Sequence, residues 1–517
     1  MKTFKQTIHS LAVAFLACFG LTSCDSFLEE YSQDLAKVES WKDLDEVLLG
    51  NVYIKPGRIY VESYTLQRDG GGFDLDILHF MSDEINMTDN NNEDIGYYED
   101  MFPFYTWQQD TGIDREKRYV GGDEKYWDQM YERINICNMI IALIDEQPES
   151  FPTDAVEKER VKGEALFMRG LYYFMLTNLY AQPYEPAKAA TTPGMPLKTT
   201  EYVEDKEFER SSLEETYSLI LSDLTESEKC LEGKTRKSRY RVDQAGVRML
   251  LSRVYLYMQN WEKSIEYAGK VLDKNSSLMS LASKSPRQSC LDVACPEILF
   301  TMGDYFVAAA FSDDRYDIPT WFISDDIAGL YSKTDYRKNL YIGESQNYAY
   351  SPVFMKVNGQ RETWGTYYGA GSVFTFRTAE AYLNIAEAAA YKGDYTTAKN
   401  YLRNFLATRM AGGPEIPDSG NELIDFIRDE RAREFLLEGH RWFDLRRYTV
   451  CEPYPWSKEI VHNYAYFADY SVDYTDMYRL EKNDAAYTLP VPRSIKSFQI
   501  SLDVIGRPAR TPFETVR

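Results

Sequence analysis

Aromatic side chains in two stretches with little helical periodicity are the residues best suited to binding chemistry. The stretches cover residues 60–124 and 303–375 and are predicted to be long ordered loops. Asp, Asn and Arg are interspersed among their rings. A sugar ring has a face of C–H groups and a rim of hydroxyls, so a Trp or Tyr ring can cover the face while polar side chains bind the rim. The residues predicted to bind a glycan are Tyr98, Tyr105, Trp107, Tyr305, Trp321, Trp364 and Tyr367. For each ring taken singly, packing in the hydrophobic core is the competing interpretation.

Residues 430–447 combine acids, arginines and one histidine at spacings that could suggest catalysis. Glu434, Glu438, His440 and Asp444 lie close together in the sequence, but they do not form His-Glu-x-x-His, and one His does not make a typical zinc site. An arginine lies three positions from each of these three acids, at Arg431, Arg441 and Arg447, which is a spacing of helical ion pairs. We therefore predict an ion-pair network that holds a helix to its neighbours, and no catalytic residue.

The acidic run at residues 89–94 is the segment that most suggests a metal. Its side chains offer hard oxygen ligands, but its sixth position is Asp94, where a calcium-binding EF-hand loop has Gly. A solvated loop is favoured, with structural calcium as the alternative, and no cofactor is predicted. Cys290 and Cys295 are interpreted as either a disulfide or a pair of free thiols. The formal charge of −23 argues against a nucleic-acid-binding surface.

The N-terminus is typical of a lipoprotein signal peptide. Lys2 and Lys5 precede a short apolar run at residues 8–21, which is too short to span a bilayer comfortably. Leu21, Thr22 and Ser23 then lead to Cys24, as in a lipobox. The sequence therefore predicts a signal peptide at 1–23, lipidation at Cys24 and an acylated stalk at 24–40.

Helical periodicity dominates much of the remaining chain. Apolar residues at helical spacing predict a helix over 125–147, and Asp154 with Glu157 predicts a capping box that opens a long helix ending before Pro183. Ser212 and Glu215 predict a second capping box.

Two segments repeat the pattern helix, tight turn, helix. The matching residues are Ala245, Leu251, Tyr257, Gln259, Asn260, Trp261, Ser264 and Tyr267 in the first segment, and Ala379, Ile385, Tyr391, Gly393, Asp394, Tyr395, Ala398 and Tyr401 in the second. The turns are expected to hold unusual dihedrals at Asn260 and at Gly393-Asp394. This layout is typical of tetratricopeptide hairpins, which stack on their neighbours to bury their apolar faces.

Assembled, these segments resemble the SusD/RagB family of nutrient-binding outer-membrane lipoproteins. The resemblance rests on the mature start at Cys24, on residues 164–184, 377–388 and 430–447, and on the closing Leu489-Pro490-Val491-Pro492. It implies a mainly α fold in which about four tetratricopeptide-like hairpins support a loop-rich half. The single domain would cover 41–517, with hairpins mainly at 125–275 and 376–447 and a C-terminal segment at 448–517.

The resemblance also implies a function. Such a protein sits on the outside of the outer membrane through its lipid, captures oligosaccharides or polysaccharides and passes them to a SusC-type TonB-dependent barrel transporter, without being an enzyme. A peptide-binding member of the same family is one alternative. A surface glycoside hydrolase is another, because no motif marks its carboxylate pair but 81 acidic residues leave room for one. A third is a helical-repeat scaffold that binds only protein.

Overall fold

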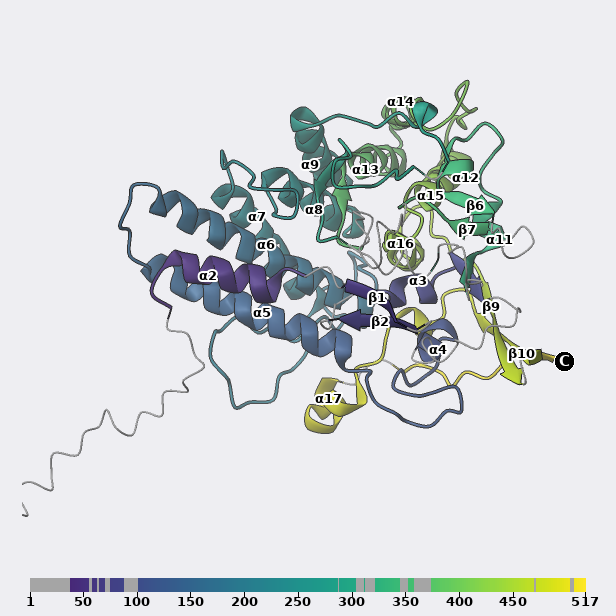
Figure 1. The fold of residues 1–517 in the computed structure, drawn as a ribbon, viewed down its shortest axis with the longest axis horizontal. Coiled ribbons are helices and arrows are strands. Elements are labelled where there is room, and N and C mark those ends of the chain that lie inside the picture. The colour runs from purple at the N-terminus through teal and green to yellow at the C-terminus, as the bar shows by residue number, and fades with distance from the viewer. Residues whose placement is uncertain are drawn as a thin grey trace, which may run out of the picture.

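Helices are the main secondary structure of the described residues, as the sequence predicts. The computed structural model describes residues 38–54, 58–62, 65–69, 75–87, 101–286, 288–303, 311, 321–344, 352–357, 373–468, 471–502 and 506–517. Figure 1 shows a layer of long helices on one side and short helices with small sheets on the other. The longer helices are α2 (Trp41–Val47), α5 (Lys125–Leu143), α6 (Asp154–Tyr180), α7 (Leu213–Cys230), α8 (Gln244–Tyr257), α9 (Trp261–Lys274), α13 (Thr378–Tyr391), α14 (Tyr395–Leu406), α15 (Gly420–Glu434) and α16 (His440–Tyr448).

Consecutive helices stack on one another as helical repeats do. Helix α5 packs on α6, α6 on α7, α8 on α9, α9 on α13, and α13 on α14. Both predicted hairpins are present, and the side chains of Asn260 and Asp394 cap their second helices. The positive φ angles fall at Gln259 and Gly393, so the first turn differs from the prediction by one residue. Trp261 stacks on Tyr391 with ring centroids 4.6 Å apart, which joins the two hairpins.

The two predicted capping boxes have different outcomes. At α7 the Ser212 hydroxyl accepts from the Glu215 N–H and the Glu215 carboxylate accepts from the Ser212 N–H, which confirms that prediction. At α6 the prediction is wrong, because Asp154 is itself helical. Its carboxylate instead accepts from the N–H groups of Ser150 and Phe151 in the preceding turn, and from the indole of Trp41.

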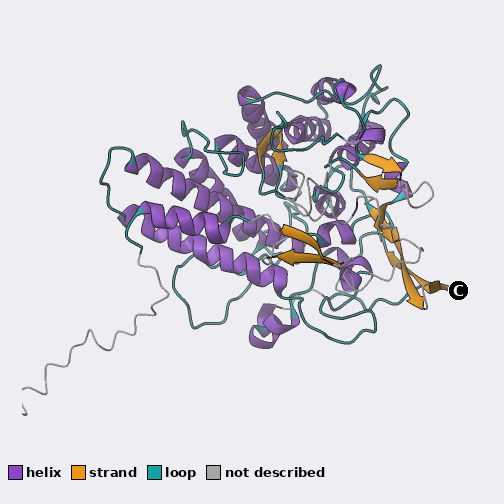
Figure 2. Cartoon of the chain, viewed as in Figure 1, coloured by secondary structure: helices purple, strands orange, loops and turns teal. Residues whose placement is uncertain are grey.

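Small antiparallel sheets and short helices lie in and beside the two aromatic-rich stretches and in the C-terminal segment (Figure 2). The strands are β1 (Arg58–Glu62), β2 (Thr65–Asp69), β3 (Ile85–Met87), β4 (Ile298–Phe300), β5 (Trp321–Ile323), β6 (Ile342–Glu344), β7 (Pro352–Phe354), β8 (Phe376–Arg377), β9 (Ile460–Ala468), β10 (Ser471–Leu480) and β11 (Glu514–Val516). They pair as β1–β2, β3–β5, β4–β8, β6–β7 and β11–β10–β9. The short helices are α3 (Ile77–Met81), α4 (Phe102–Tyr105), α11 (Asp325–Ala328), α12 (Arg337–Leu340) and α17 (Arg493–Phe498).

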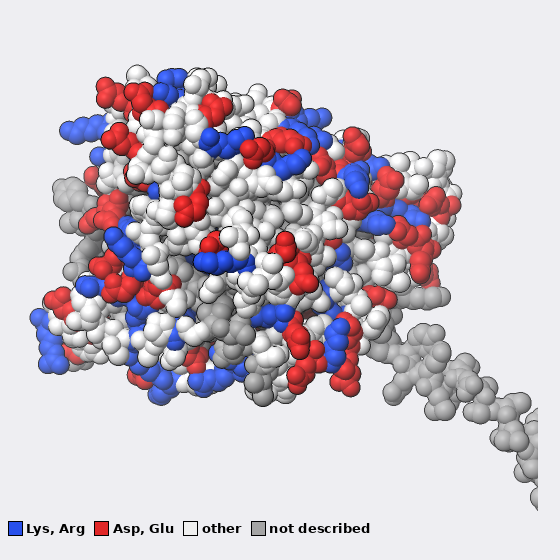
Figure 3. All heavy atoms as spheres, turned by 180° about the vertical axis from the view of Figure 1, so that it is seen from behind, with Lys and Arg blue, Asp and Glu red and all other residues white. Residues whose placement is uncertain are grey.

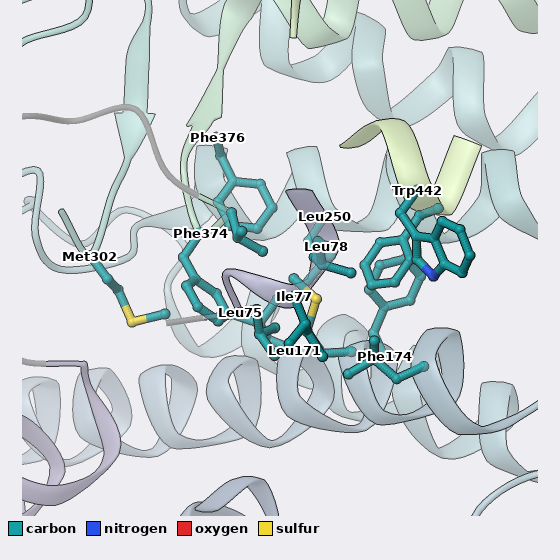
Figure 4. Close-up of a cluster of buried hydrophobic side chains, with 14 of the residues drawn as sticks. Leu75, Ile77, Leu78, Leu171, Phe174, Leu250, Met302, Phe374, Phe376 and Trp442 are labelled. Atoms are coloured by element: carbon teal, nitrogen blue, oxygen red, sulfur yellow. The ribbon is translucent and has the colours of Figure 1, made fainter. Parts of the chain in front are cut away.

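One large hydrophobic core joins the helical layer to the sheets. Figure 4 shows Leu78 of α3 near Leu171 and Phe174 of α6, with Trp442 of α16 beside them. Phe376 of β8 packs on Phe167 with ring centroids 6.0 Å apart. The sheets are therefore fixed to the helical layer by shared apolar packing.

The surface charges, the cysteines and the length of the helices each relate to what the sequence predicts. Acidic and basic side chains are interspersed over the face shown in Figure 3. Cys290 and Cys295 are buried free thiols, so the structure selects the thiol pair over the disulfide. Among the helices described here, none is long and apolar enough to cross a membrane.

Candidate functional site

Three of the aromatic residues predicted to bind a glycan lie in the hydrophobic core. Tyr105 and Trp107 are 0% exposed and Trp321 is 1% exposed. The Trp107 indole donates to the carbonyl of Met81 at 2.9 Å, and the Tyr105 hydroxyl accepts from the N–H of Met87 at 2.9 Å. Ring faces without solvent access cannot cover a sugar, so the prediction of ligand contact is wrong for these three residues.

These rings form a stack with a histidine that the sequence did not single out. His462 of β9 lies between Tyr105 and Trp107, with ring centroids 4.1 Å and 4.3 Å away. Its two ring nitrogens lie 2.7 Å from the carbonyl oxygen of Tyr105 and 2.9 Å from that of Ser82. Trp321 packs edge-on against Tyr105 at 4.6 Å. The stack therefore locks the end of α4 to β5 and β9.

The other predicted site residues lie outside the described residues. These are Tyr98, Tyr305, Trp364 and Tyr367, together with the lipidation residue Cys24 and the acidic run at 89–94. Within the part of the chain that the structure describes, no group of three or more His, Cys, Asp or Glu side chains is arranged to hold a metal ion.

The aromatic stack lies beside the paired strands β3 and β5, whose ends border residues 88–100 and 312–320. Met87, the last residue of β3, pairs with Trp321, the first residue of β5. The chain therefore enters 88–100 and leaves 312–320 from neighbouring positions. The Asn463 side chain donates to the carbonyl of Met87 at 2.9 Å, which fastens this edge to β9. Glu344 pairs with Pro352 across β6 and β7, and β7 contacts β5.

The acids and arginines of 430–447 form the buried ion-pair network that the sequence predicts. Glu434 is 0% exposed and accepts from Arg337 at 3.0 Å, from Arg377 at 2.6 Å and from Arg409 at 3.0 Å. Arg377 and Arg409 also donate to Glu297. Glu438 pairs with Arg377 and with Lys356.

A second group of buried pairs joins α8, α13, α15 and α16. Arg431 donates to Asp444 at 2.9 Å, and Arg447 donates to Asp444 at 2.8 Å. Arg253 donates to both carboxylate oxygens of Glu380 at 2.6 Å and 2.7 Å. These carboxylates face guanidinium groups and not solvent, so within this network none is placed to act as a general acid or base on a bound ligand.

Three arginines of the network were not identified from the sequence. Arg337, Arg377 and Arg409 are distant in sequence from the acids they bind, and no helical spacing relates them. The signal available in the sequence was Asp335, an acid two positions before Arg337. Arg337 is in fact 0% exposed and donates to Asp335 at 2.8 Å and 2.9 Å.

The buried ion-pair network should make the free energy of unfolding depend on pH in the acidic range. Burial alone would raise the pKa of Glu434, but Arg409, Arg377 and Arg337 outweigh burial and hold that pKa well below its ordinary value. The pKa values of Glu430, Glu438 and Asp444 are lowered in the same way by their basic partners. A carboxylate with a depressed folded-state pKa stabilises the fold fully above its unfolded pKa, and this stabilisation is lost as the pH falls toward the folded pKa.

We therefore expect the free energy of unfolding to fall steeply as the pH is lowered from about 5 to about 3, by up to about 1.4 kcal/mol per pH unit for each such group. Urea unfolding at pH 7, 5, 4 and 3 measures this free energy. Because buried pairs are screened little by salt, 0.5 M NaCl should leave the slope nearly unchanged. A free energy of unfolding that stays flat over this range would contradict the assignment.

Comparisons with known proteins agree with the fold. The family model described as "SusD family" matches residues 321–496, and a model described as "Starch-binding associating with outer membrane" matches residues 77–256. Both the aromatic stack and the ion-pair network draw on residues inside these matches. The chain belongs to the SusD/RagB family.

Individual relatives are distant. A SusD-like protein P38 of Formosa agariphila is 24% identical over 379 residues, which cover 62% of this chain and 71% of the relative. A SusD superfamily protein of Bacteroides thetaiotaomicron superposes with a TM-score of 0.67 at 20% identity, over 89% of this chain and 98% of the other. A putative sugar binding protein of Bacteroides vulgatus gives 0.65 at 20% identity, over 93% and 100%. At these identities the solved structures establish the fold alone.

Proposed function

We propose that this chain is a lipid-anchored protein of the outer cell surface that captures oligosaccharides and delivers them to a TonB-dependent barrel transporter of the SusC type. Membership of the SusD/RagB family is the observation that carries the proposal. One of the two matching family models is described as starch-binding and as associating with the outer membrane. A solved structure of the same fold is named a putative sugar binding protein.

The architecture supports a role in capture. The helical layer and the buried network make a rigid frame, and rigid frames suit binding residues carried on the segments between elements. Glu434 and Asp444, whose spacing in the sequence could suggest catalysis, are paired with arginines. The proposal therefore assigns the chain a binding role without a catalytic residue.

Anchoring is tested by replacing the lipidation residue. Cys24→Ala in the full chain should remove acylation, detected as palmitate incorporation, and should release the protein from the membrane fraction, because acyl chains supply the membrane affinity. Cys230→Ala removes a free, half-buried thiol of α7 and serves as the matched control, with labelling and fractionation unchanged. A C24A protein that still labels and sediments with membranes would overturn the anchor.

Capture is tested with soluble polysaccharides and with peptides. Affinity electrophoresis in gels containing soluble starch, xyloglucan, galactomannan, laminarin or pectin should show retardation in at least one, and reducing-sugar release from the same panel should stay at background. Release of reducing ends would favour the glycoside hydrolase. Binding of a peptide digest without retardation in any polysaccharide would favour the peptide-binding member.

A further inference from the structure

The β9–β10 hairpin carries one aromatic face from the core to the surface. Along β9 and β10, side chains on this face alternate with those on the other face, as strand geometry requires. His462, Tyr464 and Tyr478 are buried on it, at 0–1% exposure. Tyr466 and Tyr474 continue the same face toward the turn, and both are half-buried. The face therefore extends beyond the core that covers its base.

The two outer tyrosines form a fixed pair. Tyr466 and Tyr474 are direct partners in the antiparallel register, and their rings stack with centroids 4.4 Å apart and planes inclined by 17°. Tyr466 rests against buried Tyr464 at 5.2 Å, and Tyr464 rests against Phe102 of α4 at 5.0 Å. A chain of ring contacts thus holds the pair on the core, so little side-chain entropy remains to be lost when a ligand binds.

Charged groups of both signs surround the pair. Asp476, on the same face, accepts from the Thr515 hydroxyl of β11 at 2.6 Å. Burial raises the pKa of Tyr474, Asp476 and Asp473 raise it further, and Arg115 and Arg517 oppose them. Two carboxylates and two guanidinium groups therefore act on this phenol. Asp476 places a carboxylate on the same face as the ring pair. A carboxylate accepts from sugar hydroxyl groups and repels an anion, so this position favours a neutral sugar.

We propose that Tyr466, Tyr474 and Asp476 form a saccharide-binding platform for a neutral sugar unit of a polysaccharide, in which Tyr466 backs Tyr474, the outer ring face of Tyr474 covers the C–H face, and Asp476 accepts from hydroxyls. This proposal rests on the proposed function and gives it a location. The platform lies on described residues of the C-terminal hairpin, outside both stretches in which the sequence predicts binding aromatics. It is also separate from the buried stack of Tyr105 and Trp107.

The test uses affinity electrophoresis of the full chain, purified in detergent, in the same five polysaccharides. Tyr474→Ala should weaken retardation at least tenfold in a neutral polysaccharide that retards the wild type. Tyr474→Phe keeps the ring and should stay within twofold. Tyr255→Ala is the matched control, because Tyr255 is a half-buried tyrosine stacked on Tyr267 at 5.6 Å in the α8–α9 hairpin. Its retardation should equal that of the wild type.

The possible results distinguish a failure of the platform proposal from a failure of the proposed function. Equal retardation of Y474A and wild type would overturn the platform and leave the proposed function in place. A wild type retarded by none of the five would count against the proposed function and against the platform with it. Retardation by acidic pectin alone would overturn the neutral-sugar assignment.

A second measurement needs no variant, should Y474A fail to fold. Nitration of wild-type tyrosines by tetranitromethane, read by mass spectrometry, should be suppressed at Tyr466 or Tyr474 by the polysaccharide that retards the protein. Tyr255 should be nitrated equally with and without it. Unchanged nitration at both Tyr466 and Tyr474 in the presence of that polysaccharide would overturn the platform.

Discussion

Replacing Glu434 with Gln is expected to lower the free energy of unfolding by about 3–5 kcal/mol, because the change leaves buried charges without their counter-charge. Glu434 accepts from three guanidinium groups, of Arg337, Arg377 and Arg409, which are themselves 0–1% exposed. Gln keeps the shape of the side chain but carries no charge, and its amide nitrogen would face donors. Urea unfolding followed by circular dichroism measures the loss.

An exposed ion pair provides the control for Glu434. Glu226 lies 3.0 Å from Lys229, three positions along α7, and both side chains are largely exposed. Exposed pairs contribute at most about 1 kcal/mol, so Glu226→Gln should leave the unfolding midpoint nearly unchanged. If E434Q were as stable as E226Q, the buried network would not be what holds α15 to α12 and β8.

The ion-pair network was predictable in kind but not in partners. Alternating Arg and Glu at helical spacing predicts pairing along one helix, and Arg433 with Glu430 and Arg447 with Asp444 do pair in this way. The pairs that bury the acids come from α12, β8 and the segment after α14. Spacing along one helix holds no information about charges that arrive from other elements, so the sequence could not identify them.

The aromatic residues were misassigned for a related reason. Low helical periodicity and high aromatic content predict long ordered loops, but short strands and single-turn helices also lack a 3.6-residue period. Trp321 begins a three-residue strand that is entirely buried, and Tyr105 ends a four-residue helix that is also buried. Elements this short can be placed only by the tertiary packing around them.

The tyrosines of the β9–β10 hairpin were not predicted as binding residues, although some of them reach the surface. Tyr464, Tyr466, Tyr474 and Tyr478 alternate along β9 and β10 as a half-buried strand pair should. The sequence alone predicts only a C-terminal segment over 448–517. Composition marks the tyrosines but not the register shift between Val472 and Tyr474. That shift aligns Tyr474 with Tyr466 on one face, and only the structure reveals it.

Trp107→Ala is expected to destabilise the fold by about 3–5 kcal/mol, the cost of truncating a buried Trp. The change removes the ring stacked on His462 and leaves the carbonyl of Met81 without the indole donor. Trp107 also has a φ of 52°, a left-handed conformation that is costly for a bulky residue, so its packing must outweigh that strain. Thermal and urea unfolding measure the loss.

The backbone conformation supplies a sharp internal control for Trp107. Glycine adopts positive φ without a Cβ penalty, so Trp107→Gly should be as stable as Trp107→Ala or more stable by about 1 kcal/mol, whereas Gly is usually the weaker replacement. Tyr202→Ala, at a tyrosine 59% exposed, should change the unfolding midpoint little. Folded W107A should retain the polysaccharide retardation of the wild type, because the ring supports the fold and does not meet solvent. A stable W107A that no longer binds would return Trp107 to the binding site and contradict its assignment to the core.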